Sequence, residues 1–176
     1  VSRTPIREAI RMLEQEGLAR TIPRKGAEVA GMTEKDMEDV LQIRCVLEEL
    51  AARLSCQNIT DEEMRELKIA MVAFEEKTRE GNVVELAKAD VTFHDIIYRA
   101  ADNPKLLVLL NNLREQMYRY RTEYMKDDRI HPVLIREHKE MVKALESRDQ
   151  ELVAREVRQH LRNQEEVMKK IIRDQG

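Results

Sequence analysis

The sequence predicts a mainly α-helical protein, in which a short helix and a two-stranded hairpin precede an all-α antiparallel bundle of about six helices. The composition favours this class, because 37% of the 176 residues are charged, 42% are hydrophobic, and only five are glycine and four are proline. Apolar residues also recur every three to four positions over long segments, which is the period of an amphipathic helix.

Capping signals divide these segments into separate helices. Thr33 with Asp36, and Thr60 with Glu63, have the spacing of a capping box, and Asn103 before a proline favours the start of another helix. The expected helices cover residues 33–57, 60–80, 82–101, 103–125, 132–147 and 149–173. Short turns between consecutive helices make them antiparallel neighbours.

The first 31 residues differ from the remainder in charge and in pattern. They carry six Lys/Arg against four acids, whereas the remainder carries 25 against 30. Ser2 can cap a helix that ends at Gly17, with Ile6 on its inward face, and a hairpin with two cations at its turn follows. An arginine-rich helix followed by a basic hairpin is the second half of a winged helix-turn-helix, so this end is predicted to bind DNA.

Other classes of protein are disfavoured by what the sequence lacks. No apolar run approaches the roughly 18 residues of a membrane span, and no segment has the basic start and apolar centre expected of a signal peptide. Cys45 and Cys56 lie eleven residues apart in one expected helix, too far along it for a disulfide. We therefore expect a cytoplasmic protein with no membrane partner.

Imidazoles and a carboxylate lie on faces that should point into the bundle. Asp90 and His94 are one turn apart in an apolar stripe, and His138 and His160 lie in the apolar stripes of two later helices. A single buried histidine is usually hydrogen-bonded to a backbone carbonyl. Three of them with an acid favour a shared divalent transition metal, Zn, Ni or Mn.

A cation also falls on an apolar face. Arg44 shares the inward face of the first bundle helix with Leu41 and Leu47. One interpretation is a local ion pair with Glu48 one turn later, and the other is a contact with an anionic ligand. The residues by themselves leave these alternatives open.

Two blocks of sequence resemble a known family over essentially the whole chain. Residues 1–18 and 24–29 read VSRTPIREAIRMLEQEGL and RKGAEV, and are similar to the DNA-reading end of GntR-family transcription regulators. The Asp-x-x-x-His helix, with EHKEMVKALESRD and RQHL further on, resembles the FCD-type ligand-binding domain of their FadR-like branch. In that family two further helices precede the first block, so the chain resembles a piece of a longer regulator.

The resemblance implies roles for residues near the N-terminus. Arg3 and Arg7 would contact base edges, Thr4 a phosphate, and Lys25 and Gly26 would place the hairpin tip against the DNA backbone. The partner would be a palindromic operator bound by a homodimer.

The resemblance also implies that the chain has two parts with different functions. Residues 1–31 would form the C-terminal part of the winged helix-turn-helix, and residues 32–176 an all-α domain that binds metal and effector. In similar proteins an arginine in the setting of Arg44 faces the effector pocket. A small organic acid suits both the ion and this guanidinium.

Two alternatives come from other classes of protein. Three imidazoles and a carboxylate around an ion could belong to a metal-dependent hydrolase. Against that hypothesis, the Glu-x-x-His pairs of di-iron bundles and the His-Glu-x-x-His motif are missing, and we expect no further acid at the ligands. A purely structural helical module would leave the histidines and the basic hairpin unexplained.

Overall fold

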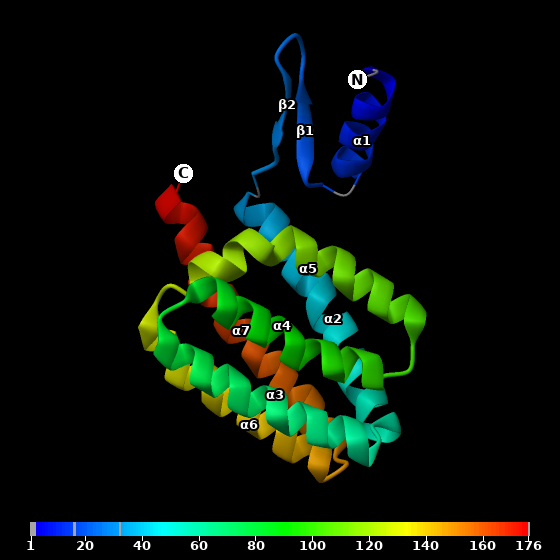
Figure 1. Cartoon of the computed structure of the whole chain (residues 1–176), viewed down its shortest axis with the longest axis vertical. Coiled ribbons are helices and arrows are strands. Elements are labelled where there is room, and N and C mark those ends of the chain that lie inside the picture. Colours follow the sequence, from blue (N-terminus) through cyan, green and yellow to red (C-terminus); the bar gives the residue numbers. More distant parts are fainter. Residues whose placement is uncertain (1–2, 16, 32, 176) are drawn as a thin grey trace.

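The computed structural model describes residues 3–15, 17–31 and 33–175, and confirms the predicted mainly helical fold class. A helix and a hairpin stand at one end of the molecule and a helical bundle forms the rest (Figure 1). The elements are α1 (Arg3–Gln15), β1 (Ala19–Ile22), β2 (Gly26–Val29), α2 (Glu34–Asn58), α3 (Asp61–Glu80), α4 (Val83–Ala100), α5 (Pro104–Tyr124), the 3₁₀ turn η1 (Asp128–Ile130), α6 (His131–Glu146) and α7 (Gln150–Gln175). The predicted division at residues 31 and 32 falls between β2 and α2, and it stays a prediction.

Local capping accounts for where the helices begin. Thr33 and Thr60 each accept a hydrogen bond from a backbone N–H three residues later, and the acid at that position bonds back, so both predicted capping boxes are present. Asn82 and Asn103 cap α4 and α5 with their side chains. Gly81 separates α3 from α4 in a left-handed conformation with φ of 70°, which glycine adopts without steric cost.

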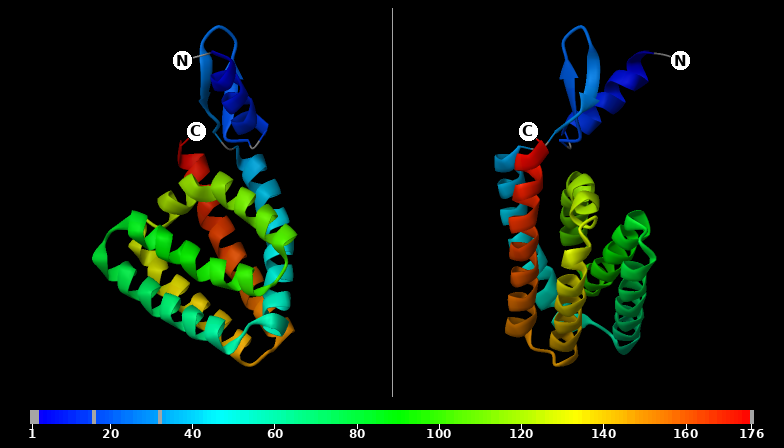
Figure 2. Two further views of the ribbon diagram at one scale, coloured as in Figure 1. Left: turned by 45° about the vertical axis from the view of Figure 1, so that its right-hand side comes forward. Right: turned by 90° about the vertical axis from the view of Figure 1, so that its left-hand side faces the viewer.

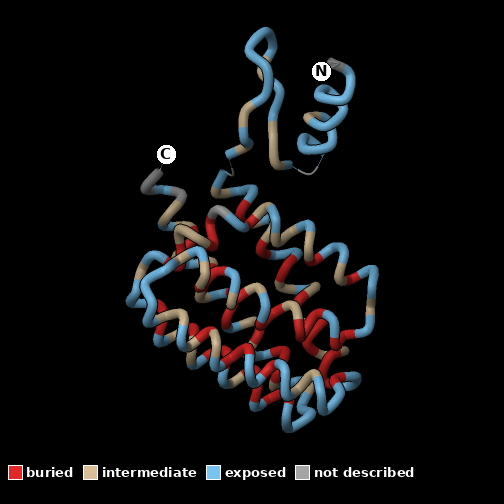
Figure 3. Tube along the Cα trace, in the orientation of Figure 1, coloured by how far each residue is buried: buried red, intermediate tan, exposed pale blue. Residues whose placement is uncertain are grey.

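The N-terminal part is an antiparallel hairpin beside a helix. β1 and β2 pair in the register Ala19↔Val29 through Ile22↔Gly26, and Gly26 has φ of 103° where the turn enters β2. The apolar face expected to point inward on α1 is largely open instead, because Ile6 is 50% and Leu13 43% exposed. Most of α1 is coloured as exposed in Figure 3. The predicted cap Ser2 lies outside the described residues.

The bundle is arranged in layers that place its polar residues at the centre. α2 and α7 lie side by side, α6 packs against α7, and α3 and α4 form the opposite side (Figure 2). Buried apolar side chains from every bundle helix form one continuous core. Within the described residues, no helix is long and apolar enough to cross a membrane.

One histidine lies in a different setting from the one expected. The helix expected over residues 132–147 would leave His131 in the preceding loop, but His131 is the first residue of α6 and is buried. Its Nε2 lies 3.0 Å from the carbonyl oxygen of Met125, so it is satisfied by the backbone. The 3₁₀ turn between α5 and α6, which the sequence pattern did not indicate, brings the two residues together.

Candidate metal and effector site

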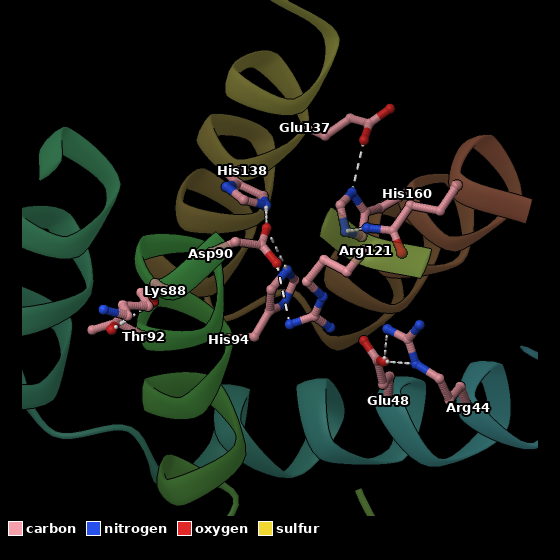
Figure 4. A network of polar contacts seen from close by, with 11 residues as sticks. Arg44, Glu48, Lys88, Asp90, Thr92, His94, Arg121, Glu137, His138 and His160 are labelled. Atoms are coloured by element: carbon pink, nitrogen blue, oxygen red, sulfur yellow. Dashed lines mark hydrogen bonds and ion pairs between the residues drawn. The ribbon is translucent and has the colours of Figure 1, made fainter. Parts of the chain in front are cut away.

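The four predicted ligand residues meet at the centre of the bundle. Asp90 and His94 come from α4, His138 from α6 and His160 from α7, and all four are buried. One ring nitrogen from each of the three histidines lies within 4.8 Å of the others. Figure 4 shows the side chains converging from the three helices. The one-turn spacing on α4 and the packing of α6 beside α7 produce this cluster.

Asp90 lies between the imidazoles and a buried guanidinium. Its Oδ1 is 3.5 Å from His138 Nε2 and 3.7 Å from His94 Nε2, and its Oδ2 is 3.4 Å from Arg121 Nη1 (Figure 4). Burial raises the pKa of Asp90, and the charge of Arg121 partly opposes this shift. Arg121 is thus the counter-charge that a buried carboxylate requires.

The histidines of α4 and α6 are held in their neutral form. Burial, the largest cause, places the pKa of both His94 and His138 well below the ordinary value, and the nearby positive charge of Arg121 lowers the pKa of each further. Neutral imidazole is the form that binds a metal ion. His138 also stacks on Phe93, with ring centroids 4.2 Å apart, which fixes the plane of its ring.

His160 is oriented by an acid that the sequence analysis did not expect. Glu137 Oε2 lies 2.7 Å from His160 Nδ1, and Asn163 donates to the other oxygen of Glu137. Because the Nδ1–H of His160 donates a hydrogen bond to this carboxylate, the lone pair of the ring is on Nε2, which is the nitrogen available to a metal ion. The expectation of no further acid at the ligands is therefore wrong. Glu137 shares one face of α6 with Leu134, and this spacing could have revealed it.

Arg44 has the local partner that the sequence offered as one alternative. Its Nε and Nη2 lie 2.9 Å and 2.6 Å from Glu48 Oε1, and both side chains are buried. The Nη1 of Arg44 has no hydrogen-bond partner among the described residues. The charge of Arg44 also opposes the rise that burial causes in the pKa of Asp90, so Arg44 lies within electrostatic reach of the site.

A second cation at the site was missed. Arg121 on α5 is buried, and its Nη1 makes no hydrogen bond within the described part of the chain. It follows Met117 by one turn and precedes Tyr124, both buried, so a cation interrupts the apolar stripe of α5. The same rule that singled out Arg44 would have found it.

The donor set suits a divalent transition ion. Both oxygens of Asp90 and both ring nitrogens of His138 are buried and, as far as the described residues go, lack hydrogen bonds. Buried polar atoms nearly always make hydrogen bonds, so a cluster of buried oxygens and nitrogens without them fits a bound metal ion. Three imidazoles with one carboxylate match the ligands that Zn, Ni and Mn accept.

The predicted DNA-contacting residues lie at the other end of the molecule. Thr4 and Arg7 are exposed on α1, and Lys25 and Gly26 are exposed at the turn of the hairpin. Arg3 is the first residue of α1, and its side chain lies outside the described part of the structure. α1 packs against β1, so the helix and the hairpin are held as one unit.

Comparison with known families places both parts of the chain. Residues 39–163 match the FCD domain, and residues 1–29 match the model described as bacterial regulatory proteins of the gntR family. The chain belongs to the GntR family of bacterial transcription regulators. It carries an FCD domain, as the sequence motifs predicted, and GntR regulators bind operator DNA.

Individual GntR regulators are similar along most of the chain. The gluconate operon transcriptional repressor of Bacillus licheniformis is 29% identical over 91% of this chain and 68% of its own length. The HTH-type transcriptional repressor RspR of Escherichia coli is 29% identical over 97% of this chain and 75% of its own length. These relatives are regulators rather than enzymes, as predicted.

Solved structures show the same fold. Escherichia coli McbR/YncC superposes with a TM-score of 0.87 at 18% identity, over 97% of this chain and 86% of that one. A GntR-family member from Pseudomonas syringae gives a TM-score of 0.67 at 24% identity, over 99% of this chain and 73% of that one. The arrangement of a winged end and a helical bundle is thus shared within the family.

Proposed function

We propose that this GntR regulator senses a small organic acid through a divalent metal ion held in its FCD domain. The observation that carries the proposal is that the buried oxygens of Asp90 and ring nitrogens of His138 lack hydrogen bonds to any described residue and lie beside the guanidinium of Arg121. A site that combines such donors with buried cations suits an ion and an anion together.

Four residues would hold the ion: Asp90, His94, His138 and His160. When bound, the ion would supply a Lewis-acidic position for an oxygen atom of the effector. The protein's own part is to keep the imidazoles neutral by burial and to fix the Nδ1–H tautomer of His160 through Glu137.

Charge favours an acid over a neutral effector. Arg44 and Arg121 are both buried, and each has an Nη1 atom without a hydrogen-bond partner in the described chain. A carboxylate can accept charge-assisted hydrogen bonds from such atoms, whereas a neutral sugar gains only weaker ones. One similar repressor is named for the operon of gluconate, which is itself a small organic acid.

The N-terminal end would read the operator. Arg3 and Arg7 would contact base edges, Thr4 a phosphate, and Lys25 and Gly26 the backbone at the hairpin tip. A homodimer would present two such ends to the two halves of a palindrome.

α2 connects the two functions. It carries Arg44 and packs along α7, which carries His160, and its first turn follows the hairpin directly in the chain. An effector that binds one dimer arrangement more tightly than another would therefore change the spacing of the two DNA-reading ends.

The proposal is tested by calorimetry with acids of two to six carbons, including acetate and gluconate, and with glucose as the neutral counterpart of gluconate. We expect at least one acid to bind the metal-loaded protein, glucose not to bind, and binding to vanish when the metal is removed by a chelator. Acid binding that is indifferent to metal removal would contradict the proposed site.

A double substitution tests whether Arg44 contributes to binding of the acid. Arg44→Met with Glu48→Gln removes both charges together, so that no buried charge is left unpaired. Affinity for the acid should fall about tenfold or more. Lys88→Met, on the exposed face of α4, is the matched control and should leave the affinity unchanged.

A further inference from the structure

A buried amide at the site blocks the ring nitrogen that a metal ion would need. Gln164 lies one turn after His160 on α7, and its Nε2 is 2.7 Å from His160 Nε2. Because the Nδ1–H of His160 donates to Glu137, the lone pair of the ring is on Nε2, and the Gln164 amide donates to it. The amide and an ion would therefore compete for the same atom.

The other half of this amide is unsatisfied. Gln164 Oε1 is buried and has no hydrogen-bond partner among the residues described. The pair His160 and Gln164 on α7 also repeats the one-turn spacing of Asp90 and His94 on α4. The side chain of Gln164 therefore makes one hydrogen bond, to a nitrogen that a metal ion would bind, and its oxygen makes none to a described residue. Because no other hydrogen bond in the described chain holds this amide, it is placed to change partners.

We infer that Gln164 exchanges partners when the site fills. It holds His160 in the metal-free protein and, once displaced, hydrogen-bonds the acid that enters the site. The second half of this inference rests on the proposed function. Displacement leaves Nε2 of Gln164 without an acceptor in the bundle core, and a carboxylate oxygen of the effector is an acceptor that matches it. Gln164 is thus a positioning residue for His160 and a specificity-determining residue for the acid.

The contact with His160 is tested in the metal-free protein. Gln164→Met keeps the length of the side chain and removes both amide groups. In ¹⁵N spectra of the imidazoles, His160 should keep its proton on Nδ1, while its Nε2 resonance moves toward that of a nitrogen without a hydrogen bond. The His160 signals are assigned by their loss in His160→Asn. An Nε2 resonance that does not move in Gln164→Met would overturn the contact.

The exchange is tested by two affinities that should move in opposite directions. Gln164→Met should bind Zn²⁺ about two- to tenfold more tightly in competition with a chromogenic chelator, because no amide has to leave. Acetate titrated into the Co²⁺-loaded variant, followed by the visible absorption of Co²⁺, should bind about tenfold more weakly.

The control and the opposing outcomes separate this inference from a structural role. Gln42→Met, exposed on α2, should change neither affinity. If Gln164→Met weakens metal and acid binding together, or changes neither, the exchange is overturned while the metal site stands. If the unaltered protein binds neither Zn²⁺ nor Co²⁺, the proposed metal site fails and the exchange fails with it, whereas the spectra still decide the contact with His160.

Discussion

Asp90 lies within 3.7 Å of two imidazoles and a guanidinium, yet neither of its oxygens makes a hydrogen bond with a described residue. A buried carboxylate in this state is costly, and Arg121 offsets only part of the cost. At the scale of single residues, the site is therefore a set of buried polar groups whose hydrogen bonds and charges are only partly satisfied by their neighbours.

The role of Asp90 can be measured as stabilisation by metal. With free Zn²⁺ at about 100 times its dissociation constant, the free energy of unfolding should rise by about 2.7 kcal/mol. Asp90→Asn keeps the shape of the side chain and removes its charge, and a tenfold loss of affinity would reduce this gain to about 1.4 kcal/mol. Urea unfolding with and without Zn²⁺ provides the measurement.

The control for this prediction lies on the same helix. Asp95→Asn replaces a half-buried acid that pairs with Arg114 away from the histidines. It should keep the full gain from Zn²⁺. An equal gain in Asp90→Asn would remove Asp90 from the site.

At the scale of elements, α2 and α7 are joined by both charge and apolar packing. Ion pairs run along the outside of this helix pair: Glu34–Arg173, Glu38–Lys169, Glu49–Arg158 and Arg53–Glu151. Beneath them lie buried apolar residues of both helices. Exposed ion pairs contribute little because water screens them and ordering the side chains costs entropy, so we expect the apolar layer to hold the two helices together.

Two substitutions on α7 separate these contributions. Leu161→Ala empties a buried position and should lower the free energy of unfolding by about 2 to 5 kcal/mol. Arg158→Met removes a two-bonded pair with Glu49 whose arginine is 39% exposed, and should cost about 1 kcal/mol or less. Urea unfolding of the metal-free protein compares them, and a larger loss for Arg158→Met would show that charge dominates.

At the scale of the whole molecule, α1 and the hairpin stand at one end, and the helices that carry the proposed sensing site form the bundle (Figure 1). α2 follows the hairpin directly in the chain and so links the two parts. The two parts also differ in their surroundings: α1 and the hairpin are mostly exposed (Figure 3), whereas the side chains of the proposed site are buried. We therefore expect the proposed sensing site to act on the DNA-binding end through the placement of whole helices rather than through direct contact.

Measurements of operator binding test the predicted contact of Arg7 with a base. Arg7→Ala should weaken binding to the specific operator by about 1 to 3 kcal/mol and relax the preference at one base pair of each half-site, because a guanidinium can pair with guanine through two hydrogen bonds. Fluorescence anisotropy with operator and unrelated duplexes at one salt concentration measures both effects.

Arg65→Ala, at an exposed arginine on α3, is the control and should leave operator affinity unchanged. Equal weakening of Arg7→Ala on every duplex would instead assign Arg7 to a phosphate. Sedimentation of the complex should give two protomers on one operator, and a single protomer would contradict the proposed homodimer.

The sequence by itself determined the helices of the bundle and the four polar residues that meet at its centre, which we propose as metal ligands. Capping boxes at Thr33 and Thr60, and the apolar period of each segment, are local signals, because they depend on residues within one turn of each other. The same local rule placed Asp90 and His94 on one face of α4. Polar residues on apolar faces were then sufficient to select His138 and His160.

Tertiary structure decided which groups complete the site. Arg121 pairs with Asp90 and Glu137 with His160 across helices, so each contact depends on how α4, α5, α6 and α7 pack. The pair of Arg44 with Glu48, one turn apart on α2, was one of two alternatives that the sequence left open, and the structure shows that this local pair forms and is buried. Spacing along a chain fixes neighbours one turn apart, but partners on different helices are fixed by packing alone.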